Sequence, residues 1–123
     1  MPAHEILIVD DSTTMRRLVR AALEPTGHSI HEACDGKDAL ARLETFTPKL
    51  VITDVNMPEM DGLALVRALR ARTDLPRIPI LVLTTVTDQA MKDEGRKAGA
   101  TGWICKPFQP ETLRTVVQTV LAR

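Results

Sequence analysis

The sequence predicts an α/β domain whose core is a doubly wound, mostly parallel sheet of five strands with five helices. Short apolar runs alternate with longer amphipathic segments from one end of the 123 residues to the other. Three of the runs are nearly continuous in β-branched residues or leucine, which suits strands that are covered on both faces. Right-handed crossovers place helices on both sides of such a sheet, so five βα units in a row give this architecture.

Each predicted strand is a short apolar run bounded by polar residues or turn formers. The five runs are Glu5–Asp10, Ser29–Ala33, Leu50–Asp54, Ile80–Thr84 and Gly102–Cys105. Doubly wound sheets carry their binding sites outside the carboxyl ends of the strands, where the strand order reverses. In a flavodoxin-like order of 2-1-3-4-5, that point lies between the ends of the first and third strands.

The predicted helices are the segments in which apolar residues recur at helical spacing. They are 15–23, Asp35–Leu43, 63–69, Thr87–Ala98 and 113–121. The fourth is expected to be the least stable, because its apolar positions reduce to Ala90, Met91 and Ala98. Gly95 lies inside this helix at a cost of about 1 kcal/mol relative to alanine, so we also expect it to be the most mobile helix.

Composition narrows the classes of protein that the sequence fits. The chain has 16 basic and 16 acidic residues, so it lacks the broad basic face of a direct nucleic-acid partner. It shows no basic leader and no apolar stretch near the ~20 residues that cross a bilayer. We therefore expect a single cytoplasmic domain over residues 1–123, monomeric and without an output domain. Cys34 and Cys105 are widely spaced, and we expect two small buried thiols and neither a zinc site nor a disulfide.

Polar side chains collect at the carboxyl ends of the predicted strands. In chain order they are Asp10 and Asp11, Asp54, Thr84 and Lys106. The carboxyl ends of parallel strands meet at one edge of the sheet, so three carboxylates, a hydroxyl and an ammonium are expected to share a pocket. Asp11 must lie in the turn to reach it, because successive strand side chains point to opposite faces.

Such a pocket predicts metal and phosphoryl chemistry. Crowded carboxylates take up protons unless a cation shares the site, and Mg²⁺ prefers a few carboxylate oxygens together with retained waters. A lysine ammonium and a threonine hydroxyl beside the metal suit the three oxygens of a phosphoryl group. An aspartate so placed can act as a nucleophile and hold an acyl phosphate. Asp11, which precedes Ser12-Thr13-Thr14, is also expected to cap the first helix.

The order of these motifs along the chain is specific. Asp-Asp follows the first strand, D-x-x-M-P-x-x-D-G the third, Thr the fourth and K-P-F the fifth. With this order and spacing the chain resembles the receiver domain of two-component response regulators over essentially its whole length. The segments DDSTTMRRLVRAAL, VITDVNMPEMDG and TGWICKPF look most like the chemotaxis receivers of the CheY type.

The resemblance implies a role for each acid at the sheet edge. Asp54 would be the phosphoacceptor. The Mg²⁺ ligands would be Asp10, Asp11, Asp54 and the backbone carbonyl of Asn56. The family also has a cis peptide bond at the position of Lys106-Pro107.

The resemblance further implies which residues rearrange on phosphorylation and which set the lifetime of the phosphorylated state. Thr84 and Lys106 would contact the phosphoryl group, and Thr84 would rearrange together with Trp103 and the fourth helix. Residues at the positions of Asn56 and Val86 tune the lifetime of the phosphorylated state in the family. The readout surface would be formed by the fourth helix, the fifth strand and the fifth helix.

The function that this predicts is a phosphorylation-controlled signalling switch and not a metabolic enzyme. A histidine kinase would be the phosphodonor, and in a chemotaxis receiver the flagellar motor switch would be the target. One alternative is a phosphorelay intermediate or phosphate sink that exchanges phosphate with a histidine phosphotransfer domain, or a regulator that works unphosphorylated. Another is a Mg²⁺-dependent phosphohydrolase with an aspartyl-phosphate intermediate, although the D-x-D acid/base and the substrate cap of such enzymes are not visible.

Overall fold

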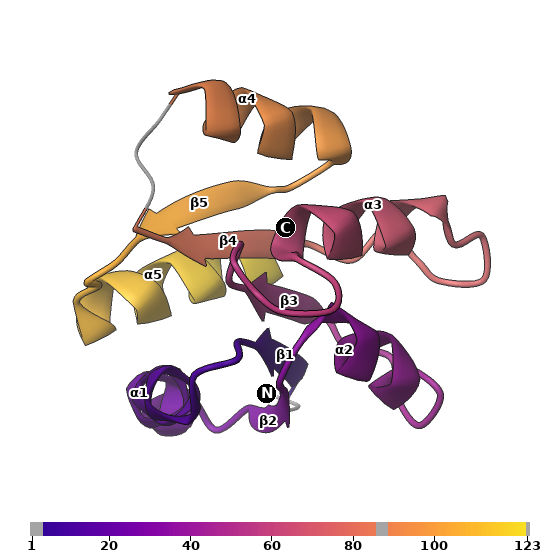
Figure 1. Ribbon diagram of the computed structural model, residues 1–123. Helices are drawn as coiled ribbons and strands as arrows, with labels where there is room; N and C mark the ends of the chain where they lie inside the picture. Colours follow the sequence, from indigo (N-terminus) through magenta and orange to yellow (C-terminus); the bar gives the residue numbers. More distant parts are fainter. Residues whose placement is uncertain (1–3, 86–88, 123) are drawn as a thin grey trace.

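Five parallel strands form one sheet with the order β2-β1-β3-β4-β5 (Figure 1). The computed structural model describes residues 4–85 and 89–122. Its elements are β1 (Glu5–Val9), α1 (Thr13–Leu23), the 3-10 helix η1 (Glu24–Thr26), β2 (Ser29–Ala33), α2 (Gly36–Arg42), β3 (Leu50–Thr53), α3 (Gly62–Ala71), β4 (Ile80–Thr84), α4 (Gln89–Ala98), β5 (Gly102–Cys105) and α5 (Pro110–Leu121). None of these described helices is long and apolar enough to cross a membrane. The predicted fold class and strand order are confirmed.

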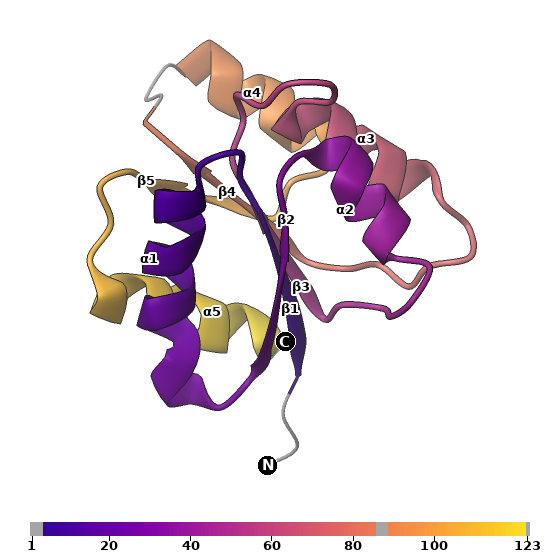
Figure 2. The same cartoon turned by 60° about the horizontal axis from the view of Figure 1, so that its bottom comes forward.

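Helices cover both faces of the sheet (Figures 1 and 2). α1 and α5 lie on one face, and α2, α3 and α4 lie on the other. Along β1, Ile6 and Ile8 are buried in the core beneath α1 and α5, whereas Leu7 and Val9 are buried in the core beneath α2 and α3. This explains the continuous apolar run of β1. Burial of each such side chain contributes about 1.5–3 kcal/mol, so the central strands firmly position the acids that follow them.

The strands that carry the acids end slightly earlier than the sequence predicted. β1 ends at Val9 and β3 at Thr53, so Asp10 and Asp54 lie just beyond their strands. Their backbones still bond to neighbouring strands. The Asp10 N–H donates to the Ala33 carbonyl at 3.1 Å, and the Asp54 N–H donates to the Val9 carbonyl at 2.9 Å. Both acids therefore have a fixed backbone position at the sheet edge.

The first helix is capped by Ser12. Its hydroxyl accepts a hydrogen bond from the Met15 N–H at 3.1 Å, and its backbone is extended, as is usual for an N-cap. The prediction that Asp11 caps α1 was therefore wrong, because the helix begins at Thr13 and leaves Asp11 in the preceding turn. Asp11 is exposed there.

The two cysteines lie at the carboxyl ends of the edge strands. Cys34 follows β2, and Cys105 is the last residue of β5. Both are free and exposed, so the prediction of buried thiols was wrong, while the absence of a disulfide between them was predicted. An edge strand has a neighbouring strand on one side only, and the small apolar character of a thiol does not by itself bury it at such a place.

α4 packs against β5 at a glycine. Gly95 is buried, and a methyl group added there would overlap Cζ2 of the Trp103 indole and lie 2.9 Å from its Cη2. The glycine that weakens this helix therefore makes room for the tryptophan. The predicted first residue of the helix, Thr87, lies outside the described residues. The low stability of α4 stays a prediction.

Gly62 lets α3 begin directly beside the residue that follows β3. Asp61 caps α3 by accepting a hydrogen bond from the Ala64 N–H at 2.8 Å, and the Gly62 N–H donates to the Val55 carbonyl at 2.8 Å. A methyl group on Gly62 would overlap the carbonyl oxygen of Asp54 and lie 3.0 Å from the Val55 Cα. These are backbone atoms, which cannot rotate away as a side chain can.

We expect Gly62→Ala to lower the free energy of unfolding by roughly 1–3 kcal/mol, the usual cost of extra atoms in a packed site. Gly102→Ala is the matched control, because its added methyl would meet the flexible Leu81 side chain at 3.3 Å. Urea unfolding followed by circular dichroism measures both values. A Gly62→Ala protein as stable as the wild type would contradict the close approach of α3 to the Asp54 carbonyl.

Candidate functional site

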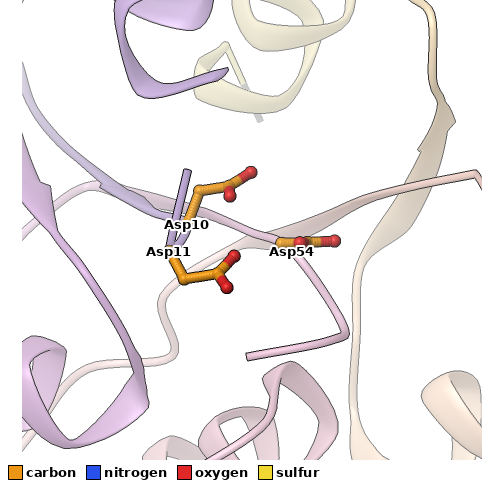
Figure 3. A group of neighbouring side chains, drawn as sticks. All are labelled: Asp10, Asp11 and Asp54. Atoms are coloured by element: carbon orange, nitrogen blue, oxygen red, sulfur yellow. The ribbon is translucent and has the colours of Figure 1, made fainter. Parts of the chain in front are cut away.

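Three carboxylates converge at the carboxyl edge of the sheet (Figure 3). The register that pairs Val9 of β1 with Thr53 of β3 places the next residues, Asp10 and Asp54, side by side. Asp11 follows in the turn, and one carboxylate oxygen from each of the three acids lies within 4.8 Å of the others. The structure thus brings together the three acids that the sequence singled out, while their roles as ligands and phosphoacceptor stay predictions.

Lys106 places a positive charge beside two of these acids. Its Nζ lies 3.3 Å from Asp10 Oδ2 and 3.4 Å from Asp54 Oδ1. The side chains are 12% exposed for Lys106, 4% for Asp10 and 12% for Asp54, so solvent ions screen these pairs little. The Lys106 N–H donates to the Thr84 carbonyl at 2.8 Å. The Lys106-Pro107 bond is cis, as the resemblance implied.

The site carries more negative charge than Lys106 offsets. Burial raises the pKa of Asp10 above its ordinary value, and the charge on Asp54 raises it further. The Ser12 N–H, which donates to Asp10 Oδ1 at 2.9 Å, and Lys106 oppose this shift in pKa without cancelling it. Asp54 Oδ1 accepts a hydrogen bond from the Val55 N–H at 2.8 Å. An additional cation would therefore stabilise the ionised site.

The acidic group fits a small, hard divalent cation. All of its donors are carboxylate oxygens, the ligand type that Mg²⁺ prefers, and they lie within 4.8 Å of one another. Thiol or imidazole ligands, which favour softer metals, do not belong to the group. Asp11 is exposed, so water can reach the site and complete a coordination shell.

The other predicted residues belong to β4, to β5 and to the segments that follow β3 and β4. Thr84 is buried at the end of β4, the strand that pairs with β3. Trp103 is half-buried on β5, and Asn56 is exposed in the loop that follows Asp54. Val86 lies outside the described residues, so its predicted role in timing has no structural test.

Two residues that support the turn of Asp10 and Asp11, called the acidic turn below, were not predicted from the sequence. The Arg16 guanidinium donates to the Asp10 carbonyl oxygen at 2.6 Å, and it is held in turn by Glu32 of β2. An arginine in an amphipathic helix usually belongs to the solvated face, so the sequence does not distinguish Arg16 from its neighbour Arg17. The contact exists only because α1 packs beside the ends of β1 and β2.

We expect Asp10→Asn to stabilise the metal-free protein at neutral pH by on the order of 1 kcal/mol. The pKa of Asp10 is raised in the folded state, so the unfolded chain loses this proton at a lower pH than the folded chain does. Wild-type stability therefore falls as the pH rises from the unfolded pKa through the folded pKa. The advantage of Asp10→Asn should shrink as the pH falls toward about 4, where the unfolded carboxyl becomes protonated.

Urea unfolding at several pH values in EDTA measures this effect of Asp10→Asn. Asp11→Asn is the matched control, because it removes an exposed acid of the same group and should gain less stability. A gain that is independent of pH, or equal in the two variants, would contradict the burial of charge at Asp10.

Comparison with known proteins identifies the family. The family model of the response regulator receiver domain matches residues 6–118. The chemotaxis protein CheY1 of Helicobacter pylori is 40% identical over 119 residues, which make up 95% of this chain and 96% of that protein. The structure of the chemotaxis response regulator CheY4 of Vibrio cholerae superposes with a TM-score of 0.90 and 42% identity, over 97% of this chain and 99% of that chain.

Some relatives are longer proteins. The probable transcriptional regulator ycf27 of Cyanidium caldarium is 37% identical over 120 residues, which are 98% of this chain and 47% of that protein. This chain therefore spans about half the length of that relative, and the likeness concerns the shared part. Since the family model and these relatives match nearly all of the chain, the protein belongs to the receiver domain family of the response regulators, which act in two-component signalling.

Proposed function

We propose that this receiver domain is a phosphorylation-controlled switch in which Asp54 accepts a phosphoryl group from a histidine kinase. The position of Asp54 carries the proposal. It lies beside two carboxylates that can share a Mg²⁺ ion with it, and its Oδ1 lies 3.4 Å from Lys106 Nζ. A nucleophilic carboxylate needs cations on both sides, because the incoming phosphoryl group brings further negative charge.

The proposed transfer is an in-line displacement. An Asp54 carboxylate oxygen attacks the phosphorus, the new O–P bond forms as the N–P bond of the donor phosphohistidine breaks, and the electron pair of the broken bond stays on the imidazole nitrogen. Lys106, already beside Asp54, would donate to a phosphoryl oxygen. Bound Mg²⁺ would neutralise part of the developing charge, and its proposed ligands are Asp10, Asp11, Asp54 and the Asn56 carbonyl.

The proposed signal leaves through β4, β5 and α4. Thr84 is buried at the end of β4, and its carbonyl accepts the Lys106 N–H. A phosphoryl group on Asp54 that bonds the Thr84 hydroxyl would therefore pull on both strands. Trp103 of β5 fills the space over Gly95 of α4, so its indole would transmit this displacement to the helix.

The proposed output is the binding of another protein to the face formed by α4, β5 and α5. Two relatives that match over almost their full length are named as chemotaxis proteins, which supports a chemotaxis role with the flagellar motor switch as the target. In that role the chain would act in the cytoplasm as one monomeric domain. The ycf27 relative supports a second candidate, a receiver that controls transcription through a further segment of chain.

Two positions are proposed to set the lifetime of the phosphorylated state. Asn56 is exposed and lies close after Asp54 in the loop, where it can influence the approach of water to the acyl phosphate. The second position is Val86, whose side chain has neither a carboxylate nor an amide, and its proposed role rests on the sequence alone.

We expect acetyl phosphate with Mg²⁺ to add one phosphoryl group to the protein, measured as intact mass. Asp54→Asn and EDTA should each abolish the added mass, because the first removes the nucleophile and the second removes the cation. Asp61→Asn is the matched control, since Asp61 is a carboxylate of the same loop that caps α3, and this variant should still be phosphorylated. If neither acetyl phosphate nor a phosphohistidine donor phosphorylates the wild type, the proposal of a phosphorylation-controlled switch is refuted. A binding module that works without phosphate would then replace it.

We expect Gly95→Ala to displace the Trp103 indole, because the added methyl would overlap its ring. The fluorescence maximum of Trp103, the single tryptophan of the chain, should shift toward that of an exposed indole. Stability should not rise by the ~1 kcal/mol that alanine normally gains over glycine in a helix. Arg96→Ala at the exposed neighbouring position is the control. An unchanged spectrum together with a full gain in stability would rule out the packing of the indole on α4.

A further inference from the structure

We propose that Arg16 is a positioning residue that holds the Asp10-Asp11 turn in the arrangement that binds Mg²⁺. The inference rests on the proposed function, because it concerns the same metal site. Arg16 lies on α1 and reaches the turn through a backbone oxygen of Asp10, at 2.6 Å from Nη1. It acts on the site through Asp10 and Asp11, and it does not itself contact the metal or the phosphoryl group.

Each nitrogen at the end of the Arg16 side chain has its own acceptor. Nη1 donates to the Asp10 carbonyl oxygen at 2.6 Å. Nη2 donates to Thr13 Oγ1 at 3.2 Å, and Nε donates to Glu32 Oε1 at 3.1 Å. These acceptors belong to the acidic turn, the start of α1 and β2. The planar guanidinium therefore ties three backbone segments together, which the single ammonium of a lysine cannot do in the same geometry.

Glu32 fixes the orientation of Arg16. Its second oxygen, Oε2, accepts a hydrogen bond from Arg20 Nε at 2.7 Å, and Arg20 Nη2 also donates to the Ile30 carbonyl at 3.1 Å. Burial alone would raise the pKa of Glu32, but the hydrogen bonds and charges of Arg20 and Arg16 outweigh it and lower the pKa. The Glu32 carboxylate is therefore ionised at neutral pH, and charge-assisted hydrogen bonds of this kind are about twice as strong as neutral ones.

Arg16 completes the anchoring of the Asp10 backbone. The Asp10 N–H donates to the Ala33 carbonyl at 3.1 Å, so with Arg16 on the carbonyl oxygen both backbone polar groups of Asp10 are bonded. That carbonyl belongs to the planar peptide that continues into Asp11. Asp11 is exposed, and within residues 4–85 and 89–122 no hydrogen bond or ion pair holds its carboxylate. The place of this carboxylate in the acidic group therefore depends on the backbone that Arg16 fixes.

Simple electrostatics predicts the opposite effect of removing Arg16. A guanidinium bonded to Asp10 repels a dication bound nearby, so its loss would tighten Mg²⁺ binding if Arg16 were only a charge. A positioning role predicts weaker binding, because residues that orient metal ligands typically contribute 10–100-fold to metal affinity. The direction of the change in Kd therefore separates the two roles.

The experiment compares the Kd of MgCl₂, measured by isothermal titration calorimetry, for the wild type, Arg16→Gln and Arg17→Gln. Arg17 is the exposed neighbour on α1, so its variant removes the same charge without the contact to Asp10. We expect Arg16→Gln to raise the Kd by about 10–100-fold and Arg17→Gln to leave it nearly unchanged. Arg16→Lys keeps the positive charge but loses the planar guanidinium with its several donors, so it should also weaken Mg²⁺ binding. Unchanged or tighter binding in Arg16→Gln would overturn the proposal.

Glu32→Gln keeps the proposal testable if Arg16→Gln does not fold, which urea unfolding would reveal. Glutamine has the shape of glutamate but lacks the charge that orients Arg16, so Mg²⁺ binding should weaken in the same direction and by less. An unchanged Kd for Glu32→Gln would then overturn the proposal.

Acetyl phosphate separates this inference from the proposed function. Phosphorylation of Arg16→Gln should be slower than that of the wild type at low Mg²⁺ and should return to the wild-type rate at saturating Mg²⁺. If the wild type binds Mg²⁺ but is never phosphorylated on Asp54, the proposed function is refuted. The comparison of Kd values still tests the role of Arg16. If the wild type is phosphorylated and Arg16→Gln binds Mg²⁺ with the same Kd as the wild type, only the proposed role of Arg16 is refuted.

Discussion

Crowding of like charges at one edge of the sheet is the constraint on which the rest of the structure depends. One oxygen from each of three carboxylates lies within 4.8 Å of the others, and Asp10 is almost fully buried. Such crowding opposes folding. It is tolerated because the acids follow the central strands β1 and β3, whose side chains are buried nearly throughout. The best-packed part of the fold therefore carries the group that is hardest to stabilise.

Lys106 links this central site to the edge of the sheet. It follows β5, which β3 and β4 separate from β1, yet its ammonium reaches both Asp10 and Asp54. Any change in the charge of Asp54 must alter its ion pair with Lys106. Because Lys106 belongs to the same chain segment as Trp103, this path leads from the acids to the edge strand and then to α4. The proposed output face lies where that path ends.

Much of this site could be predicted because its acids directly follow predicted strands in the sequence. Acids directly after apolar strands must meet when the strands are parallel. Arg16 could not be predicted, since its contact with the acidic turn needs the packing of α1. From the sequence, Gly95 was only a residue that lowers the stability of its helix. Its contact with Trp103 could not be predicted, because the two residues meet only in the folded structure. The exposure of Cys34 and Cys105 was missed because burial was inferred from the residue type alone, although the predicted strand order already placed both cysteines at edge strands.

Different kinds of contact hold the two sides of Asp54. On the β1 side, two arginines of α1 share the ionised Glu32 and tie the helix to β2 and to the acidic turn. On the β4 side, α4 is joined to α3 by the ion pair of Arg67 and Glu94, which is 3.5 Å long and more than half exposed, and exposed pairs contribute only about 0–1 kcal/mol. α4 also packs Ala98 against the core beneath α2 and α3 and meets Trp103 at Gly95, a position without a side chain. The sequence predicts that α4 is the least stable helix, so we expect new charge on Asp54 to displace α4 before the turn of Asp10 and Asp11. The proposed metal ligands would then keep their places while the proposed output face changes, so the same acidic group would both accept the phosphoryl group and transmit the signal.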